Sequence, residues 1–488
     1  MHICLKDNQY NGVEWKEAVR PENTPFSEDV ENILKRYKGI NLKELIGNEK
    51  KFGKFLFFPP DVAKSDLDDK DKYLFRLLDS DSEKESKDPK FRTSNVMGFF
   101  SLRGEKEEDG EVRMQITSRF DDAEGKNNFF LHYMLQRVGG FAIAPRTSSG
   151  DESFYDFLPY LFPYYLKEAC KQGVFRAYVT REYNDANVRG PIDVARHIRF
   201  NIPFNGKVAY HTREYTTDNK ITQLVRHTIE YIRSTGLLIL DSDARDDVGE
   251  IIEATPTYSK GERSRVIAQN LHPVTHPYYT AYEPLRILCL GILQHKKLSY
   301  GEDSQNNIAG ILFDGASLWE EYLNVLLTEH YGNRLIHPNN RTGDNKQHLF
   351  DRDESDENRT IYPDFLLNLS RDKYTAETVL DAKYKPLDEK GLSRDDSYQM
   401  LSYMFRFNSK QGFLIYPLNS TDENKTLYNK KYALFRDTDI TIKTIAFEIP
   451  QKNANGDFDS FCKEMKAAEG TFIDRIVEEL QSHHAPLP

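Results

Sequence analysis

The chain has few cysteines, no long apolar run and no excess of positive charge. Its four cysteines lie far apart in 488 residues and form no CxxC pair, so neither a zinc module nor a disulfide framework is expected. The longest apolar run covers only residues 287–293, whereas a membrane span needs about 20 residues. The N-terminal residues also lack the apolar core of a signal peptide. We therefore expect a soluble cytoplasmic protein without a membrane partner.

Acidic residues outnumber basic ones, 77 to 66, which gives a net charge of −11. This balance excludes a protein that coats nucleic acid through bulk positive charge, but it leaves room for a local basic groove. The content of 39% hydrophobic and 12% aromatic residues excludes a disordered chain. No GxxxxGK[ST] phosphate loop occurs, so we expect this chain to bind no nucleotide itself.

Length and pattern predict a multi-domain α/β protein of about three domains. Residues 1–140 are predicted as a β-rich domain, because Val96–Leu102 and the alternating Val112–Ile116 form a hairpin pattern. Residues 141–304 have mainly helical spacing. In residues 305–488 a helix, two strands, a helix and further strands follow one another, which predicts an α/β domain with a mixed central sheet.

The residues best suited to chemistry are Pro363-Asp364 and, further along, Asp381-Ala382-Lys383. An acid-x-Lys triplet alone is weak evidence, because a chain with 77 acidic residues contains several by chance. Here, however, the triplet lies in an apolar segment that reads as a strand. Alternation along that strand points Asp381 and Lys383 to the same face. Asp364 lies on the preceding strand of the predicted hairpin and can reach the same end of the sheet.

Two carboxylates on neighbouring strands can bind a hard divalent cation, Mg²⁺ or alternatively Mn²⁺. The cation lowers the pKa of a bound water, and an adjacent lysine can orient that water and offset charge on a phosphorane-like transition state. This combination predicts phosphodiester hydrolysis. The alternative is a structural ion pair, in which Lys383 only neutralises Asp381 on a solvated strand face. The residue pattern leaves both interpretations open.

Three segments together, 363–364, 381–385 and 396–403, resemble the PD-(D/E)xK nuclease core of the McrC family. McrC is the nuclease subunit of McrBC modification-dependent restriction systems. Residues 318–322 resemble the Leu-Phe-Glu segment on the first core helix of that family, and residues 189–193 resemble part of its middle region. The resemblance implies a restriction-endonuclease-like fold for residues 305–488.

Carried over to this chain, the resemblance makes Asp364 and Asp381 metal ligands and Lys383 the catalytic lysine. The backbone carbonyl of Ala382 adds a further oxygen ligand. Gln399, on the following helix, becomes an accessory active-site residue, with a polar residue at a helix edge as the alternative interpretation.

The first core helix carries two adjacent acids, Glu320 and Glu321. The resemblance implies that Glu320 faces the metal. Helical phase places both at the margin of the apolar stripe, so periodicity does not choose between them. After the triplet, Tyr384 is predicted to pack in the interior, and Lys385 to contact a DNA phosphate or simply to lie in solvent.

The resemblance also implies partners. An McrB-like AAA+ GTPase hexamer would recognise modified double-stranded DNA and translocate, while this chain docks through its N-terminal and middle regions, stimulates GTP hydrolysis and cuts. Arg189, Arg196 and Arg199 are candidates for contacts with the partner or with DNA, although ordinary surface charges explain them equally. The expected function is a Mg²⁺-dependent endonuclease subunit in antiviral defence. The alternatives are a non-cutting activator of an AAA+ ring and a stand-alone PD-(D/E)xK nuclease of another defence pathway.

Overall fold

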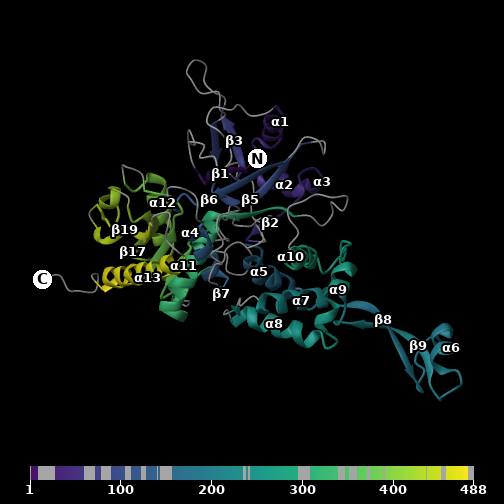
Figure 1. Cartoon of the computed structure of the whole chain (residues 1–488). Helices are drawn as coiled ribbons and strands as arrows, with labels where there is room; N and C mark the ends of the chain where they lie inside the picture. Colours follow the sequence, from purple (N-terminus) through teal and green to yellow (C-terminus); the bar gives the residue numbers. More distant parts are fainter. Residues whose placement is uncertain are drawn as a thin grey trace. The chain divides into compact units, whose positions relative to one another are not determined.

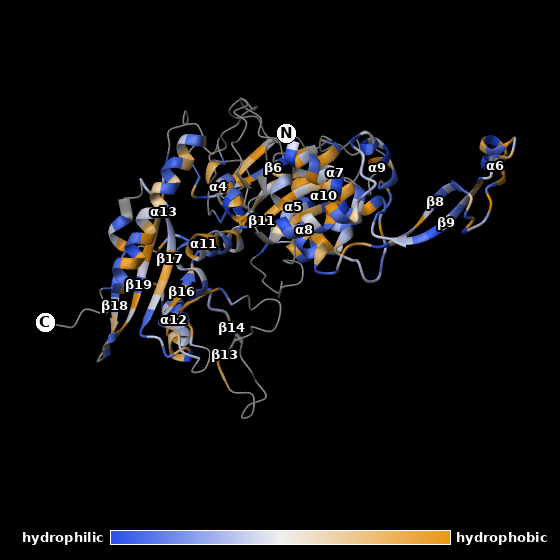
Figure 2. Ribbon diagram, turned by 90° about the horizontal axis from the view of Figure 1, so that it is seen from below, coloured by the Kyte–Doolittle hydropathy of each residue, from blue (hydrophilic) through white to orange (hydrophobic). Residues whose placement is uncertain are grey.

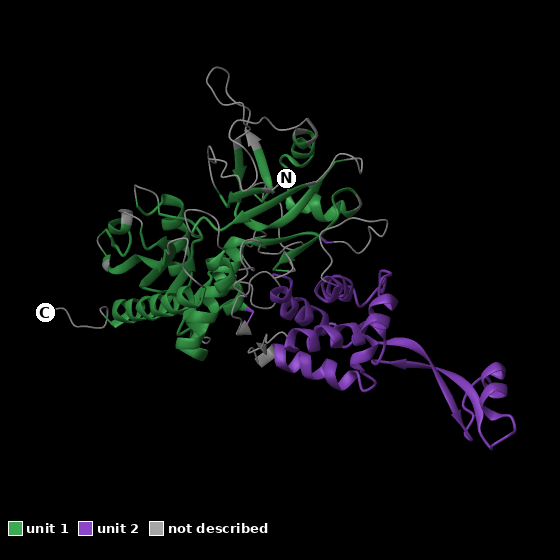
Figure 3. Cartoon of the chain, viewed as in Figure 1, with its two compact units in different colours: residues 1–138, 144–151, 309–488 green, residues 139–143, 152–308 purple. Residues whose placement is uncertain are grey.

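The computed structural model divides the chain into two compact units (Figure 3). Unit 1 comprises residues 1–138, 144–151 and 309–488, and unit 2 comprises residues 139–143 and 152–308. The predicted first and third domains thus fall in one unit, and the three-domain division stays a prediction. The residues that the structure describes are 2–8, 28–59, 72–78, 90–104, 111–121, 128–139, 141–142, 157–234, 238–239, 242–294, 308–338, 347–350, 360–370, 374–387, 391–421, 423–435, 437–451 and 458–481.

A five-stranded sheet forms the first part of unit 1, in the order β1-β6-β5-β11-β2. These strands are β1 (His2–Lys6), β2 (Lys54–Phe58), β5 (Val96–Arg103), β6 (Glu111–Thr117) and β11 (Ile308–Asp314). Strands β5 and β6 pair antiparallel, which confirms the predicted hairpin, while β1 runs parallel to β6. Around the sheet lie α1 (Glu28–Tyr37), α2 (Leu42–Gly47), α3 (Glu49–Phe52) and the pair β3 (Phe75–Leu78) and β4 (Lys90–Thr93).

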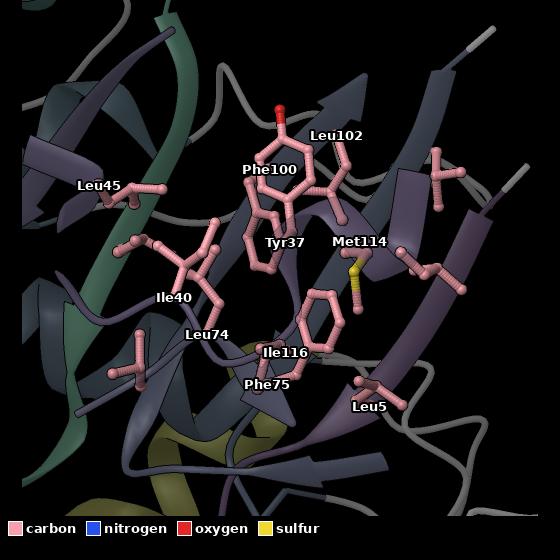
Figure 4. Close-up of a cluster of buried hydrophobic side chains, with 14 of the residues drawn as sticks. Leu5, Tyr37, Ile40, Leu45, Leu74, Phe75, Phe100, Leu102, Met114 and Ile116 are labelled. Carbon is pink, nitrogen blue, oxygen red and sulfur yellow. The ribbon is translucent and has the colours of Figure 1, made fainter. Parts of the chain in front are cut away.

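A cluster of buried apolar side chains stabilises this sheet (Figure 4). Tyr37 of α1 packs beside Phe100 of β5, and Met114 of β6 lies between them and Leu5 of β1. Each of these residues is almost fully buried, and burial of one such side chain contributes about 1.5–3 kcal/mol. Burial of these side chains therefore contributes to the stability of the first sheet and of α1 packed against it.

Strand β11 belongs to this first sheet, which the sequence pattern did not predict. It pairs antiparallel with β5, with Gly98 opposite Leu312. A Cβ at Gly98 would lie 2.1 Å from the carbonyl oxygen of Ile311, so only glycine permits this close approach. Because α11 (Gly315–Tyr331) follows β11 directly, the first sheet fixes where this helix begins.

The second part of unit 1 is a six-stranded sheet in the order β12-β15-β16-β17-β19-β18. Its strands are β12 (Leu335–Ile336), β15 (Phe365–Leu367), β16 (Thr378–Ala382), β17 (Gln411–Asn419), β18 (Lys431–Leu434) and β19 (Asp437–Ile449). Strand β16 is antiparallel to β15 and parallel to β17, and β17 is parallel to β19. The predicted mixed sheet is thereby confirmed. The helices of this part are α4 (Phe129–Val138), α11, α12 (Arg394–Arg406) and α13 (Phe458–Gln481).

The buried side chains of this sheet explain why the central strands form where they do. The first eight residues of β17 are all buried, as expected for a strand covered on both faces. Helix α12 begins at the N-cap Ser393, whose hydroxyl accepts from the backbone N–H of Asp396 at 3.1 Å. A small pair, β13 (Gln347–His348) and β14 (Thr360–Ile361), lies beyond the sheet. The acidic loop predicted at 351–357 lies outside the described residues.

Unit 2 is mainly helical, as the sequence predicted (Figure 1). It contains α5 (Leu158–Cys170), α7 (Lys220–Ser234), α8 (Ser242–Ala254), α9 (Arg263–Gln269), α10 (Tyr282–Gln294) and the short pair β7 (Phe141–Ala142) and β10 (Leu238–Ile239). A long antiparallel ribbon of β8 (Ala177–Asp185) and β9 (Val208–Thr216) extends from these helices and carries α6 (Val194–Asn201) at its far end. Apolar residues are concentrated on α5 and α10 (Figure 2), which pack against one another. Among the helices that the structure describes, none combines the length and the apolar character required to cross a membrane.

Candidate active site

The end of β16 carries the acid-x-Lys triplet. Strand alternation places Asp381 and Lys383 on the same face, and Lys383 Nζ lies 2.5 Å from Asp381 Oδ2. Lys383 follows the last residue of β16, but its N–H still donates to the carbonyl of Ile415 on β17 at 2.8 Å. Asp381 is only 2% exposed. The ion pair predicted as the structural alternative thus exists, but it is buried rather than solvated.

The second carboxylate reaches this strand from its antiparallel neighbour. Phe365 of β15 pairs with Leu380 of β16, which brings Asp364, immediately before β15, to the end of β16. Asp364 Oδ2 accepts a hydrogen bond from the backbone N–H of Ala382 at 2.6 Å. Asp364, Asp381 and Lys383 therefore gather around one peptide segment.

Helix α12 contributes an amide and a third carboxylate. Lys383 Nζ donates to Gln399 Oε1 at 2.6 Å, and Gln399 Nε2 donates to the hydroxyl of Tyr403 at 2.8 Å. Asp396, one turn earlier on the helix, lies 4.0 Å from Lys383 Nζ. The lysine is thus fixed from two elements, which limits its rotamers.

His337 lies close to both acids of α11 and to Asp364. The Nε2 atom of His337 lies 3.5 Å from Glu320 and 3.7 Å from Glu321. The Nδ1 atom of the same ring lies 2.7 Å from the backbone carbonyl oxygen of Asp364. The charge of Glu320 contributes to raising the pKa of Asp364. The assignment of Glu320 as the metal-facing acid stays a prediction.

In this site several carboxyl groups interact with one another and with the ammonium group of Lys383. Burial, and after it the charges of Glu320 and Asp381, raise the pKa of Asp364 well above its usual range. For Lys383, burial opposes the charged form, but the neighbouring carboxylates outweigh burial and raise its pKa. Lys383 is therefore protonated at neutral pH, so it can donate hydrogen bonds and stabilise negative charge but cannot act as a base in this state.

The donor set suits a hard divalent cation. One oxygen of each aspartate is engaged, by the Ala382 N–H and by Lys383, and no described residue donates a hydrogen bond to the other oxygen of either. Among the described residues, no three carboxylate, histidine or cysteine side chains converge as a ready-made metal cage. Mg²⁺ binds through one or two carboxylates and keeps several waters, so the two aspartates and the Ala382 carbonyl fit Mg²⁺ better than a metal that needs many protein ligands.

Two residues near the site had no role in the sequence prediction. His337 links α11 to Asp364, and a lone histidine 27 residues away gave no signal for this. Asp396 accepts from Lys385 Nζ, 2.8 Å away, and from the hydroxyl of Tyr416, 3.2 Å away. Lys385 is therefore paired with a carboxylate and does not simply lie in solvent.

The three arginines considered for partner or DNA contact lie at the far end of the ribbon of unit 2, Arg189 between β8 and α6 and the other two on α6. Arg189 donates to the hydroxyl of Tyr210 at 3.2 Å, and Arg196 lies 3.4 Å from Glu182. The guanidinium of Arg199 lies 5.4 Å from the ring centre of Phe200. All three have contacts within the ribbon, so no contact with a partner is needed to explain them.

Comparison with known proteins finds one matching family model and similar solved structures. A model of the family described as "McrBC 5-methylcytosine restriction system component" matches residues 91–417. A chain in the refined half-complex from a tetradecameric assembly of Thermococcus gammatolerans McrB AAA+ hexamers with bound McrC is similar at 16% identity and a TM-score of 0.45, over 96% of this chain and 99% of that chain. A chain in the cryo-EM structure of the Thermococcus gammatolerans McrBC complex is similar at 15% identity and a TM-score of 0.29, over 67% of this chain and 87% of that chain. No curated protein matches in sequence.

Proposed function

Since this chain belongs to the McrBC 5-methylcytosine restriction system component family, whose model matches residues 91–417, we propose that it is the DNA-cutting subunit of such a system. Its activity is Mg²⁺-dependent hydrolysis of phosphodiester bonds in double-stranded, modified DNA. The observation that carries this proposal is the convergence of Asp364, Asp381 and Lys383 on the peptide of Ala382, with Lys383 Nζ fixed by Asp381 and Gln399.

The proposed chemistry follows from what each side chain can do. Asp364, Asp381 and the Ala382 carbonyl present oxygen ligands for Mg²⁺, as in a PD-(D/E)xK nuclease. When bound, Mg²⁺ supplies positive charge that stabilises the reacting phosphate and acidifies water. Lys383, which is protonated, donates to the attacking water or to a phosphate oxygen and offsets the charge that develops there. Gln399 orients the lysine during this step, because its amide oxygen accepts a hydrogen bond from the ammonium group.

We further propose that an AAA+ GTPase ring recognises the DNA and that unit 2 docks on it. The far end of the ribbon supports this, because several large apolar side chains there lie in solvent, among them Ile202 at 66% and Phe204 at 70% exposure. Grouped exposed apolar residues mark surfaces that a partner covers. Figure 2 shows hydrophobic segments, coloured orange, around α6. An acidic nuclease held on DNA by such a partner does not need strong DNA binding of its own.

Plasmid cleavage by the complex with its partner, GTP and Mg²⁺ tests the proposed activity. We expect Lys383→Ala to lower the cleavage rate at least 100-fold, because the transition state loses its fixed cation. Lys385→Ala is the matched control, since this lysine lies two residues away but pairs with Asp396. We expect its cleavage rate to stay within about threefold of the parent, as for other partly exposed ion pairs.

Cleavage that is undiminished in Lys383→Ala would refute the active-site assignment. Two further outcomes would identify the rival functions. Stimulated GTP hydrolysis without any Mg²⁺-dependent nicking by the parent would identify a non-cutting activator. Cleavage by the isolated chain without a GTPase would identify a stand-alone nuclease.

The docking proposal is tested by copurification. We expect Ile202→Ser combined with Phe204→Ser to reduce recovery of the GTPase partner at least tenfold. Phe435→Ser, which changes an even more exposed aromatic residue in unit 1, serves as the control and should leave recovery unchanged. Equal recovery with both variants would refute docking through the ribbon.

A further inference from the structure

The residue after the catalytic lysine is fixed by the first sheet of unit 1 rather than by its own sheet. The backbone carbonyl of Tyr384 accepts from Arg119 Nη2 at 3.1 Å, and its hydroxyl lies 2.8 Å from the hydroxyl of Ser118. The guanidinium of Arg119 also lies over the Tyr384 ring, 4.9 Å from its centre. Arg119 and Ser118 directly follow β6, so the residue after Lys383 is bound to the end of a strand of the first sheet.

Arg119 is itself rigidly held. Its backbone N–H donates to Asp7 Oδ1 at 2.6 Å, and its Nη2 lies 3.1 Å from Asp7 Oδ2. The same Nη2 donates to Asn95 Oδ1 at 2.6 Å. The Asp7 side chain is fully buried, and only 10% of the Arg119 side chain is exposed. A buried, charge-assisted bond set of this kind leaves the guanidinium little freedom.

Asn95 connects this network to the helix that carries Glu320. Its backbone carbonyl accepts from the N–H of Gly315, the first residue of α11, at 2.8 Å. A Cβ at Gly315 would lie 2.6 Å from the Tyr384 ring, so the start of α11 and the exit of β16 are in direct contact. Two segments at one end of the first sheet, Asn95 before β5 and Ser118–Arg119 after β6, thus contact the start of α11 and the residue that follows Lys383.

We propose that Arg119, with Asp7 and Asn95, is a positioning residue that aligns the Asp381–Lys383 segment for DNA cleavage. Arg119 touches none of the reacting atoms and acts through the carbonyl and ring of Tyr384. This inference rests on the proposed nuclease function, but the alignment itself is a property of the chain that can be measured without DNA. Displacement of catalytic groups by about 1 Å costs on the order of 100-fold in rate, so a network that prevents it has a large effect.

Hydrogen–deuterium exchange and cleavage kinetics on the complete chain test the proposal. In Arg119→Met we expect faster exchange of the amides in 380–385, where the Lys383 N–H bonds to Ile415. With the partner, GTP and Mg²⁺, kcat for cleavage should fall at least tenfold while KM for DNA stays within about twofold. Arg119→Lys should recover only part of kcat, because the shorter ammonium side chain keeps the charge but cannot stack on the Tyr384 ring and reach all three acceptors around Nη2.

Arg137→Met is the matched control for lost stability. Arg137 is also partly buried and paired with carboxylates in unit 1, Glu329 at 2.6 Å and Glu469 at 3.2 Å, but no described contact joins it to β16. Its thermal midpoint should fall as that of Arg119→Met does, without faster exchange in 380–385 and without a lower kcat. Should Arg119→Met fail to fold, Asn95→Ala removes one contact, leaves the pair with Asp7, and should show the same changes to a smaller extent.

The outcomes separate this inference from the proposed function. Parent-level exchange in 380–385 and parent-level kcat in Arg119→Met, with cleavage lost in Lys383→Ala, would overturn the positioning role alone. If the parent does not cleave DNA, the proposed function fails, and the exchange of 380–385 still decides whether Arg119 aligns the segment.

Discussion

Unit 1 contains two buried carboxylate clusters that differ in what surrounds the negative charge. Glu469 of α13 accepts from the hydroxyls of Tyr133 and Tyr322 at 3.0 and 2.8 Å and lies 3.2 Å from Arg137. At the end of β16, by contrast, Asp364 and Asp381 lie near one another and near Glu320, with Lys383 as the central cation. The first arrangement is satisfied within the protein. The second brings together carboxyl groups that raise one another's pKa, which is characteristic of a site that binds a cation or substrate.

The largest difference between the two clusters is expected when one acid of the cluster at the end of β16 is neutralised. Asp364→Asn keeps an oxygen that can accept from the Ala382 N–H but loses the charge. We expect DNA cleavage by the full complex to fall about 1,000-fold, while the thermal midpoint stays equal or rises by a few degrees, because repulsion from Glu320 and Asp381 is relieved. A variant that cleaves normally, or one that unfolds many degrees earlier, would place Asp364 among the structural acids.

The converse change at the first cluster should affect stability alone. Glu469→Ala leaves Arg137 without its buried carboxylate and two tyrosine hydroxyls without an acceptor, which should lower the free energy of unfolding by about 3 kcal/mol. Urea denaturation measures this loss. Cleavage per folded molecule should stay at the parent level at a temperature where the variant is folded. If the free energy of unfolding falls by less than about 1 kcal/mol, the contacts of Glu469 do not stabilise this cluster as proposed.

A third test concerns the amide that fixes the lysine. Gln399→Ala removes a hydrogen bond to a charged group, which is worth about 1.5–3 kcal/mol, so we expect kcat to fall roughly tenfold with little change in KM. Gln399→Glu, which keeps an acceptor, should retain more activity than the alanine variant. If the two substitutions are equally harmless, Gln399 is only a polar residue at a helix edge.

The smallest effect is expected at Asp396, beside the lysine. Burial raises its pKa, but hydrogen bonds with Lys385 and Ser393 and the charges of Lys385 and Lys383 outweigh burial, so the pKa of Asp396 is lowered. Its charged form therefore contributes stability above the ordinary aspartate pKa of about 4, on the order of 1 kcal/mol. Asp396→Asn should be less stable than the parent at neutral pH, and the gap should close as the pH falls through the lowered pKa. A stability difference between Asp396→Asn and the parent that grows as the pH falls would contradict a lowered pKa for Asp396.

The comparison also explains how much of the molecule could be predicted from the sequence. The positions of Asp381 and Lys383 follow from strand alternation, and Asp364 follows from a hairpin, so these contacts are local consequences of pattern. The mixed sheet could be predicted for the same reason. The role of Arg119 could not, because its contact with Tyr384 joins residues 265 positions apart. Nor could the insertion of β11 into the first sheet, since its apolar run fits many partners. The catalytic roles themselves stay predictions.

Metal binding tests the central claim most directly, and it requires neither DNA nor the partner. Mn²⁺, a spectroscopic substitute for Mg²⁺, can be titrated into the complete chain and followed by electron paramagnetic resonance. We predict that the parent and Glu469→Gln bind one Mn²⁺ with similar affinity, and that Asp381→Asn binds it at least tenfold more weakly. Equal affinity in the parent and Asp381→Asn would contradict a divalent-cation site at the end of β16.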